Sequence, residues 1–467
     1  MTHNPSYLVL EARFIAGSYG GTEWPPAPFR LLQAMVAGLR TINHPALRWF
    51  EAQPAPLILA QSEPPPVQFR RSVPNNANPS KQQSLTTLRD VIRRQVQQPV
   101  WYCYAIPAQT SAETIASALE AAYAVHTLGV GEDMCVVEGR VSISRPESKN
   151  GITLWQPTGA PTLVSQTGEV RLNVPVAGSL TSLEERFQAF QQRLDQQAHG
   201  YGRPVLPPAR HGVVAYRSSD DAPRWAVVPL TLCQPGQTNK PARFHAERTV
   251  VVAGMLRHAC MQLAGNGLLA DFAAGYGSPE DKDSRLSWIP LPSVGHAYVD
   301  GMVRRALLMS RLVDAEKLEA LLGSGLADGL SLVDEQTGEC VAIAEPADGR
   351  DDAVFQQYFR SSRTWCTVTP MVMPGDYAES QRLLNRLLIK SLKESGLDPS
   401  LLVRAEFSKQ GFMPQAVRIR DLKLKDWKAK RLEVQHVRLH FSKPIRGPMV
   451  LGRGRHYGIG LFCANSE

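Results

Sequence analysis

The segment Trp288–Gly301, WIPLPSVGHAYVDG, carries two side chains that could take part in acid–base chemistry. A strand-like WIPLP run leads into a turn that contains His296 and Tyr298 and ends at Asp300–Gly301. Because the unperturbed pKa of histidine lies near neutrality, an exposed histidine in a loop can act as a general acid or base. A single histidine is also often structural, so the local sequence leaves both interpretations open.

A second segment, Gly447–Phe462 (GPMVLGRGRHYGIGLF), combines glycines with basic and aromatic residues. A P-loop requires GxxxxGK[ST], but Arg453 and Gly454 follow Gly452 here. A dinucleotide-binding turn opens a βαβ unit and has an acidic residue about 20 residues later, whereas seven residues follow Gly460. The segment is therefore either a loop whose glycines let the backbone approach a ligand closely, or a glycine-kinked strand without a ligand.

The positive charge of the chain is concentrated around this second segment. The chain has a net charge of +8, and residues 418–455 hold twelve Lys and Arg against three acidic residues, a local balance of +9. A concentrated basic surface is typical of a site for a polyanion, because counterions released from phosphates drive association. The alternative is a basic face that is only solvated.

Two further stretches could contact a nucleic acid. Residues 61–84 are rich in Pro, Asn, Ser and basic residues, which predicts a long loop. Residues 360–375 place arginines and a tryptophan ahead of a strand, and these types suit phosphate binding and base stacking, although the tryptophan could equally belong to the core. The residues concerned are Arg70, Arg71, Arg360, Arg363 and Trp365.

The motif HVRLH has the spacing of a zinc-protease helix, but its periodicity argues against one. Apolar residues alternate with His436, Arg438 and His440, which predicts a strand, and strand residues four apart lie roughly 13 Å from each other. The two histidines therefore could not hold one metal, and the three polar residues would share a face. No other His, Asp and Glu cluster in the sequence has metal-ligand spacing, and we predict no cofactor.

The elements that must position these residues follow a repeated order. Strand, loop and helix appear in turn from Tyr7, from Trp225 and again from Arg363. Three such units, followed by further strands, predict an α+β fold of tandem ferredoxin-like (RRM-like) βαββαβ-type domains with antiparallel sheets. The polar turn SSDDAPR, residues 218–224, is the most plausible boundary, which divides the chain into residues 1–222 and 223–467.

Composition indicates a globular, cytoplasmic protein. No apolar run approaches the roughly 18–20 residues that span a bilayer, and the N-terminus does not have the pattern of a signal peptide. The seven cysteines are scattered and never spaced as CxxC, which argues against a disulfide framework and a thiolate zinc site.

Five segments appear in an order that resembles the fused Cas five/Cas six-type subunit (Csb family, GSU-type) of type I-G, formerly I-U, CRISPR systems. The resemblance spans essentially the whole chain. It implies that residues 1–222 are like the Cas five-type subunit, which binds the 5′ handle of the crRNA in Cascade. It implies that residues 223–467 are like the Cas six-type repeat-RNA endoribonuclease, with two ferredoxin-like units and a C-terminal glycine-rich loop. The segments are EWPPAPFRLLQAMVAGL, VPVAGSLTSLEERF, LSWIPLPSVGHAYVDG, SRTWCTVTPMVMPG and GRGRHYGIGLF.

The chemistry that the resemblance implies is metal-independent cleavage of repeat RNA. A base activates the 2′-OH, its attack on the phosphate gives a 2′,3′-cyclic phosphate, and an acid protonates the leaving 5′ oxygen. The leading base is His296, with Tyr298 nearby, and His258 is the second candidate. Family members commonly carry further histidines where this chain has Tyr276 and Tyr298, so Tyr276 is a candidate too. Arg257 and Arg455 could stabilise the phosphate.

The resemblance also implies the partners, which are CRISPR repeat RNA and crRNA, the backbone and large subunits of Cascade, and target DNA indirectly through the complex. Two alternatives stay open, a non-catalytic crRNA-binding subunit of Cascade and, more distantly, a nucleotide-dependent enzyme. The residues expected to bind RNA are Arg70, Arg71, Arg257, Arg360, Arg363, Trp365, Arg446, Gly452, Arg453, Gly454, Arg455, His456, Gly458 and Gly460.

Overall fold

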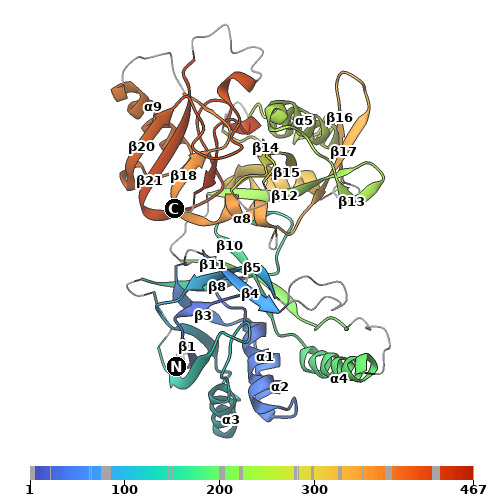
Figure 1. Cartoon of the computed structure of the whole chain (residues 1–467), viewed down its shortest axis with the longest axis vertical. Coiled ribbons are helices and arrows are strands. Elements are labelled where there is room, and N and C mark those ends of the chain that lie inside the picture. The colour runs from blue at the N-terminus through green and yellow to red at the C-terminus, as the bar shows by residue number, and fades with distance from the viewer. Residues whose placement is uncertain are drawn as a thin grey trace. The chain divides into compact units, whose positions relative to one another are not determined.

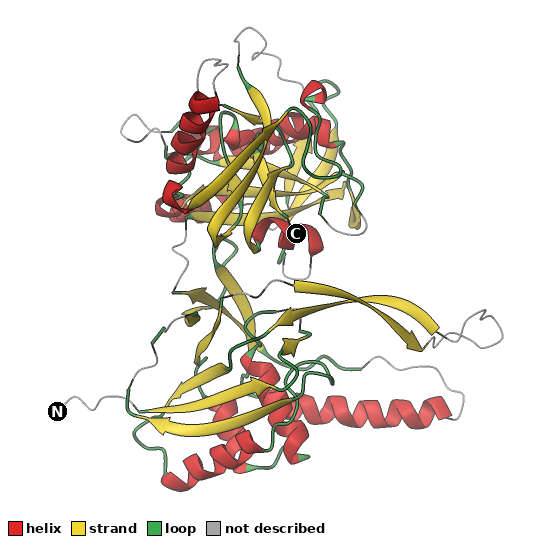
Figure 2. Ribbon diagram, turned by 60° about the vertical axis from the view of Figure 1, so that its left-hand side comes forward, coloured by secondary structure: helices red, strands yellow, loops and turns green. Residues whose placement is uncertain are grey.

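The structure is a computed structural model in which the chain divides into two compact units. Unit 1 consists of Met1–Pro161 and Glu169–Asp221, and unit 2 of Thr162–Gly168 and Ala222–Glu467. Figures 1 and 2 show the elements of both units. The described residues are 6–21, 23–62, 64, 66–74, 86–144, 147–148, 151–198, 206–219, 224–277, 281, 283–295, 299–323, 325, 329–349, 352–373, 381–422 and 432–465.

Unit 1 contains a seven-stranded antiparallel sheet in the order β10-β11-β8-β3-β6-β1-β7. Its β3-β6-β1-β7 part, with helices after β1 and β6, has the strand order of a ferredoxin-like βαββαβ unit. The elements are β1 (Tyr7–Phe14), α1 (Pro28–Leu39), α2 (Pro45–Ala52), β3 (Leu57–Gln61), β6 (Val100–Ala105), α3 (Ala112–Tyr123), β7 (Cys135–Ser142), β8 (Ile152–Gly159), β10 (Glu169–Val174), α4 (Ser179–Ala198) and β11 (Gly212–Ser218).

The core of unit 1 follows from local sequence patterns. Leu8 and Leu10 alternate along β1 and pack with helices α1 to α3 on one face of the sheet (Figure 1). Helix α1 starts with Pro28, whose fixed φ suits a first turn, and it buries Leu31 and Met35. The other face of β1 is buried too, in a smaller cluster around Tyr7 and Val9.

A second, three-stranded sheet in unit 1 corrects the loop expected at residues 61–84. Its order is β2-β5-β4, with β2 (Ser18–Tyr19), β4 (Pro66–Pro74) and β5 (Thr86–Gln95). Strand β4 pairs with β5 along its whole length, from Pro66 opposite Arg94 to Pro74 opposite Thr86. Residues 75–85 lie outside the described residues.

Unit 2 begins with a second ferredoxin-like arrangement. Its sheet has the order β14-β15-β12-β17-β16, with helices after β12 and β15. The segment Thr162–Gly168 contributes β9, which pairs with β12 through Gln166 and Ala226. The elements are β9 (Ser165–Gln166), β12 (Trp225–Gln234), β13 (Gln237–Pro241), α5 (Thr249–Ala264), α6 (Ala270–Ala274), β14 (Ser287–Pro292), β15 (Val303–Arg311), α7 (Ala315–Leu322), β16 (Leu330–Val333) and β17 (Cys340–Pro346).

The third ferredoxin-like arrangement follows, with β20-β21-β18-β23 in the expected antiparallel order. Helix α9 follows the first strand (Figure 1), and the place of the second helix, between β21 and β23, is taken by the glycine-rich segment with the short 3-10 helix η7. The elements are α8 (Ala353–Phe359), β18 (Ser361–Thr367), β19 (Met371–Val372), α9 (Gln381–Glu394), β20 (Leu402–Ser408), β21 (Val434–Arg446), β22 (Met449–Val450), η7 (Arg455–Tyr457) and β23 (Leu461–Ala464).

The predicted fold class, tandem ferredoxin-like domains with antiparallel sheets, is therefore confirmed. The strand predicted for HVRLH is also present, as part of β21. All seven cysteines are free thiols. Within the described part of the chain, the structure contains no helix with the length and apolar character needed to cross a membrane.

Candidate nucleic-acid interface

The glycines of Gly447–Phe462 serve the fold of the segment itself. Gly452, Gly458 and Gly460 have φ between +70° and +89° and are buried. A Cβ at Gly460 would overlap the carbonyl oxygen of Leu451, and one at Gly458 would lie 3.1 Å from atoms of Pro290 and Thr249. These three glycines therefore allow close internal packing, and their expected contact with RNA stays a prediction. Gly454, at φ +79°, is half-buried and precedes η7.

The two arginines of the segment differ in their surroundings. Arg453 is exposed, its backbone N–H donates to Val372 O at 2.8 Å, and its side chain makes no ion pair with another described residue. Arg455 Nη1 instead donates to Glu394 Oε2 at 3.3 Å, and its side chain is 19% exposed. Arg453 is thus the cation that the segment presents to solvent.

His456 is held inside unit 2 and is not a candidate for proton transfer at neutral pH. Its Nδ1 lies 2.6 Å from Ser287 Oγ on β14, so the imidazole links η7 to the neighbouring sheet. Burial, followed by the nearby charges of Arg455 and Arg285, lowers the pKa of His456 to about 3. The ring is therefore neutral at pH 7, and the adjacent Tyr457 packs on Trp288 with ring centroids 5.4 Å apart.

Helix α5, which also contacts η7, carries a group of predicted residues. Arg257 donates from Nε to Ala274 O at 2.9 Å and from Nη2 to the Tyr276 hydroxyl at 3.1 Å. Its guanidinium carbon also lies 5.4 Å from the centre of the Tyr276 ring, which is 70% exposed. His258 lies on the exposed face of α5 and pairs with Gln262 at 3.0 Å. The structure thus joins a predicted cation to a predicted catalytic tyrosine.

The turn that carries the leading candidates is described in part. His296 and Tyr298 lie outside the described residues. At the end of the turn, Asp300 accepts hydrogen bonds from the guanidinium of Arg304 and from the backbone N–H of Met302. The hydrogen bond from Arg304 lowers the pKa of Asp300 to about 2, so this carboxylate is ionised at neutral pH and is not a proton donor.

The arginines and the tryptophan around β18 have mostly structural contacts. Trp365 is fully buried and donates from Nε1 to Ser362 O at 3.0 Å, so it is a core residue and cannot stack on an RNA base. Arg360 Nη2 donates to Ala464 O at 2.8 Å, and the carbonyl oxygen of Arg446 accepts from Arg224. Arg363 is exposed and makes no ion pair with another described residue.

The structure does not place His436, Arg438 and His440 on one polar face. His436 is completely buried between Thr367 Oγ1 and Val417 O, both at 3.0 Å, and burial lowers its pKa. His440 is half-exposed and contacts Glu406 at 3.0 Å. The prediction fails for His436 because the loop before residue 422 covers that end of β21.

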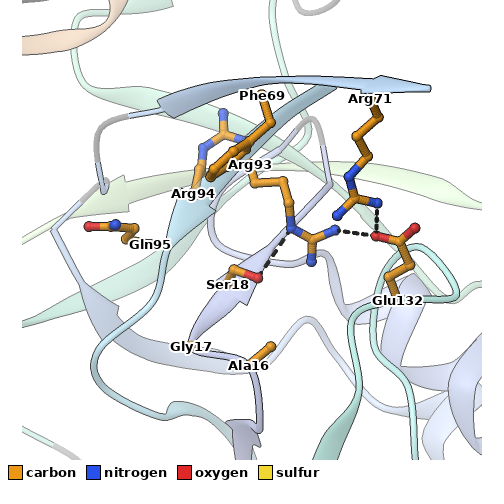
Figure 3. A pocket seen from close by; sticks show the side chains of 9 residues that line it. All are labelled: Ala16, Gly17, Ser18, Phe69, Arg71, Arg93, Arg94, Gln95 and Glu132. Atoms are coloured by element: carbon orange, nitrogen blue, oxygen red, sulfur yellow. Dashed lines mark hydrogen bonds and ion pairs between the residues drawn. The ribbon is translucent and has the colours of Figure 1, made fainter. Parts of the chain in front are cut away.

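The predicted arginines of unit 1 lie on the β4–β5 hairpin. Arg70 is exposed, and Arg71 forms an ion pair with Glu132 beside a pocket that the sequence did not reveal (Figure 3). The pocket also contains Arg93 and Arg94 from β5. The two Arg-Arg pairs, Arg70–Arg71 and Arg93–Arg94, were the sequence signal for it, but their meeting depends on the hairpin register.

Five of the twelve basic residues of the 418–455 stretch lie at positions 423–431, outside the described residues. Within the ranges that the structure describes, no three His, Cys, Asp or Glu side chains are grouped so that they could hold a metal ion. The described basic side chains that reach solvent in unit 2 include Arg453 and Arg363, and the partly exposed Arg257 lies beside Tyr276.

These features define a class of protein, a chain of tandem ferredoxin-like units with a basic glycine-rich segment in place of one helix. The family model of the CRISPR-associated protein, GSU0054 family, matches residues 13–464. The chain therefore belongs to this CRISPR-associated family, as the resemblance of its motifs predicted.

Two further comparisons complete this result. No curated protein matches the chain. Among solved structures, the chain is similar to one described as "Cas6 (TTHB231) product complex", with 13% sequence identity and a TM-score of 0.26. The match covers 51% of this chain and 97% of that structure's chain.

Proposed function

We propose that this protein is a metal-independent endoribonuclease that cleaves CRISPR repeat RNA to mature crRNA and then stays as a subunit of a type I-G Cascade complex in the cytoplasm. Residues 223–467 would carry the cleavage site, and residues 1–222 would bind the 5′ handle. The backbone and large subunits of Cascade would be its protein partners, and it would meet target DNA through the complex.

The observation that carries the proposal is the Arg257–Tyr276 pair on unit 2. A guanidinium bound to an exposed phenol hydroxyl combines a cation, which suits a phosphate, with a group that can exchange a proton. His258 is exposed one residue along the same helix. The side of unit 2 formed by α5 and η7 also includes the basic glycine-rich segment, which supports an RNA surface there.

The proposed reaction needs no co-reactant. A base, for which His296 is the leading candidate and His258 the second, takes the proton of the 2′-OH, and the 2′ oxygen bonds to phosphorus. The bond from phosphorus to the 5′ oxygen breaks, and an acid such as Tyr276 or Tyr298 gives that oxygen a proton. Arg257 would stabilise the charge that develops on the phosphate.

Cleavage of labelled repeat RNA by the purified full chain in EDTA tests the proposal. We expect two fragments, of which the upstream one ends in a 2′,3′-cyclic phosphate. RNA that is bound tightly but stays intact would contradict the nuclease and favour a non-catalytic crRNA-binding subunit. ATP that protects against thermal unfolding, with no effect of repeat RNA, would favour a nucleotide-dependent enzyme.

Histidine variants then test the roles. His296→Ala should lower the cleavage rate by roughly 10²- to 10⁴-fold while RNA affinity changes only a few-fold. His126→Ala is the matched control, because His126 is an exposed histidine of unit 1. A wild-type rate for His296→Ala would move the role of the base to His258, which His258→Ala tests in the same assay.

A further inference from the structure

A pocket of about 340 Å³ in unit 1 is formed by the β4–β5 hairpin, the turn between β1 and β2, and the loop before β7 (Figure 3). This volume lies at the lower end of the range for small-molecule sites, about 300–1,000 Å³. The residues that line it are Ala16, Gly17, Ser18, Phe69, Arg71, Arg93, Arg94, Gln95 and Glu132.

Arg93 is the buried cation of the pocket and is 6% exposed. Its guanidinium pairs with the fully buried carboxylate of Asp133 and donates to Ser18 Oγ at 3.1 Å and to Glu132 at 3.2 Å. Asp133 in turn accepts backbone N–H groups of Gly20 and Val130. Arg93 is therefore fixed in place by buried partners before any ligand arrives.

One exposed aromatic side chain, Phe69, lines the pocket beside its charged groups. Phe69 lies on β4 and is 44% exposed, and Figure 3 shows its side chain among those that line the pocket. An exposed aromatic ring beside arginines suits a ligand with a flat apolar part and an anionic part.

We infer that this pocket binds one unstacked nucleotide of a single-stranded RNA, with the base on Phe69 and a phosphate on Arg71. The inference rests on the proposed function in taking RNA as the ligand. Aromatic rings stack on bases of any sequence, and arginine binds phosphate oxygens in a bidentate manner. Both groups come from strand β4, two residues apart, so both side chains lie on the same face of the strand.

The carboxylate of Glu132 and a phosphate of the RNA would compete for the same cation, Arg71. Glu132 pairs with Arg71, and the two side chains are 58% and 42% exposed, so this ion pair is open to solvent and weak. A phosphate can replace Glu132 on Arg71, while Arg93 keeps its buried partner Asp133. The carboxylate thus competes with RNA for Arg71.

Photo-crosslinking of the full chain to a single-stranded repeat RNA that carries 4-thiouridine tests the inference. We expect a crosslink in the peptide that contains Phe69, and Phe69→Ala should weaken binding roughly 5- to 160-fold, the range for loss of one base stack. Leu88→Ala is the matched control, since Leu88 is a 65% exposed apolar residue of the same hairpin outside the pocket. Equal affinities of the two variants would overturn the inference.

Glu132→Gln gives a test with the opposite sign. Removal of the competing carboxylate should tighten RNA binding about 2- to 5-fold, the range expected for one exposed ion pair. Glu113→Gln, which removes an exposed carboxylate elsewhere in unit 1, should have less effect. Unchanged or weaker binding by Glu132→Gln would contradict the competition, because a purely structural Glu132 could not oppose RNA.

The crosslinking result at Phe69 and the cleavage result test different proposals. Repeat RNA that is cleaved by unit 2 but gives no crosslink at Phe69 would overturn this inference and leave the proposed nuclease intact. A crosslink at Phe69 with uncleaved RNA would support the pocket and contradict the nuclease.

Discussion

The β4–β5 hairpin of unit 1 and the glycine-rich segment of unit 2 both combine basic and aromatic residues, yet they use them in different ways. In the hairpin, Phe69 and Arg71 remain at the surface beside a pocket. In the glycine-rich segment, His456 and Tyr457 are turned onto β14, and Arg455 is tied to Glu394. The glycine-rich segment, which has the more conspicuous sequence, thus uses more of its side chains for internal contacts than the hairpin does.

The difference has a simple physical origin. A two-stranded hairpin is thin, so side chains on its faces stay accessible unless another element covers them. The glycine-rich segment replaces a helix between two sheets, and its backbone must approach Val372 and Leu451 closely enough to exclude a Cβ. Packing therefore requires glycine at these positions. Arg453 is the exposed cation of the segment.

The largest expected effect concerns this packing. Gly460→Ala should destabilise the protein by roughly 2–5 kcal/mol, because a positive φ and a backbone clash act together. Gly338→Ala is the control, since Gly338 has a nearly identical φ of +71° but open space around it, and should cost about 1 kcal/mol. Urea unfolding measures both, and equal losses would mean that the clash is relieved by local movement.

Aromatic residues give the next test. Tyr457→Ala should lower the free energy of unfolding by roughly 2 kcal/mol, less than for a fully buried ring, because Tyr457 is half-buried against Trp288. Phe69→Ala should change it by about 0.5 kcal/mol or less, as expected for an exposed position. Similar costs for the two variants in urea unfolding would remove the distinction between the regions.

The pH dependence of stability should reflect the neutral His456. Its pKa is about 3 in the fold against 6.5 for the unconstrained side chain, so the unfolded chain binds a proton first as the pH falls. Stability is then full above pH 6.5 and is lost as the pH falls toward 3, by about 1.4 kcal/mol between pH 8 and 5.5. His456→Gln should remove this part of the loss, whereas His211→Gln, at an exposed histidine, should not.

The smallest effect separates the two arginines of the glycine-rich segment. Arg453→Ala should weaken RNA binding a few-fold and reduce the slope of log affinity against log salt by about 0.7–0.9, the value for one lost phosphate contact. Arg455→Ala should change the slope less, because Arg455 is already paired with Glu394. An equal loss of slope for both would mean that RNA displaces Glu394.

The fold was predicted from the local spacing of apolar residues. Apolar residues at alternating spacing predicted β1 and β21, and those at helical spacing predicted α1 and α9, because these periods reflect which side of each element faces the core. The same alternation was present in residues 67–73, yet the abundance of Pro, Asn and Ser nearby favoured a loop. Pairing with β5 outweighed that composition.

The candidate site was predicted less completely, because side-chain roles depend on neighbours that are distant in the chain. Arg257 and Tyr276 were chosen separately and meet in the structure. Trp365 has the composition of a stacking residue but lies in the core, and the carboxylate of Glu132 meets Arg71 across 61 positions.

The sequence by itself determined the tandem ferredoxin-like fold, the family and the residue types available for RNA chemistry, since periodicity and motif order are local properties. Tertiary structure alone decided which of those residues are free to act. The glycine-rich segment looked like a ligand cradle in sequence, but packing against distant parts of unit 2 buries most of it, while the β4–β5 register assembles a pocket from residues with no common motif. Burial and register are set by contacts between distant segments, and no local pattern specifies them.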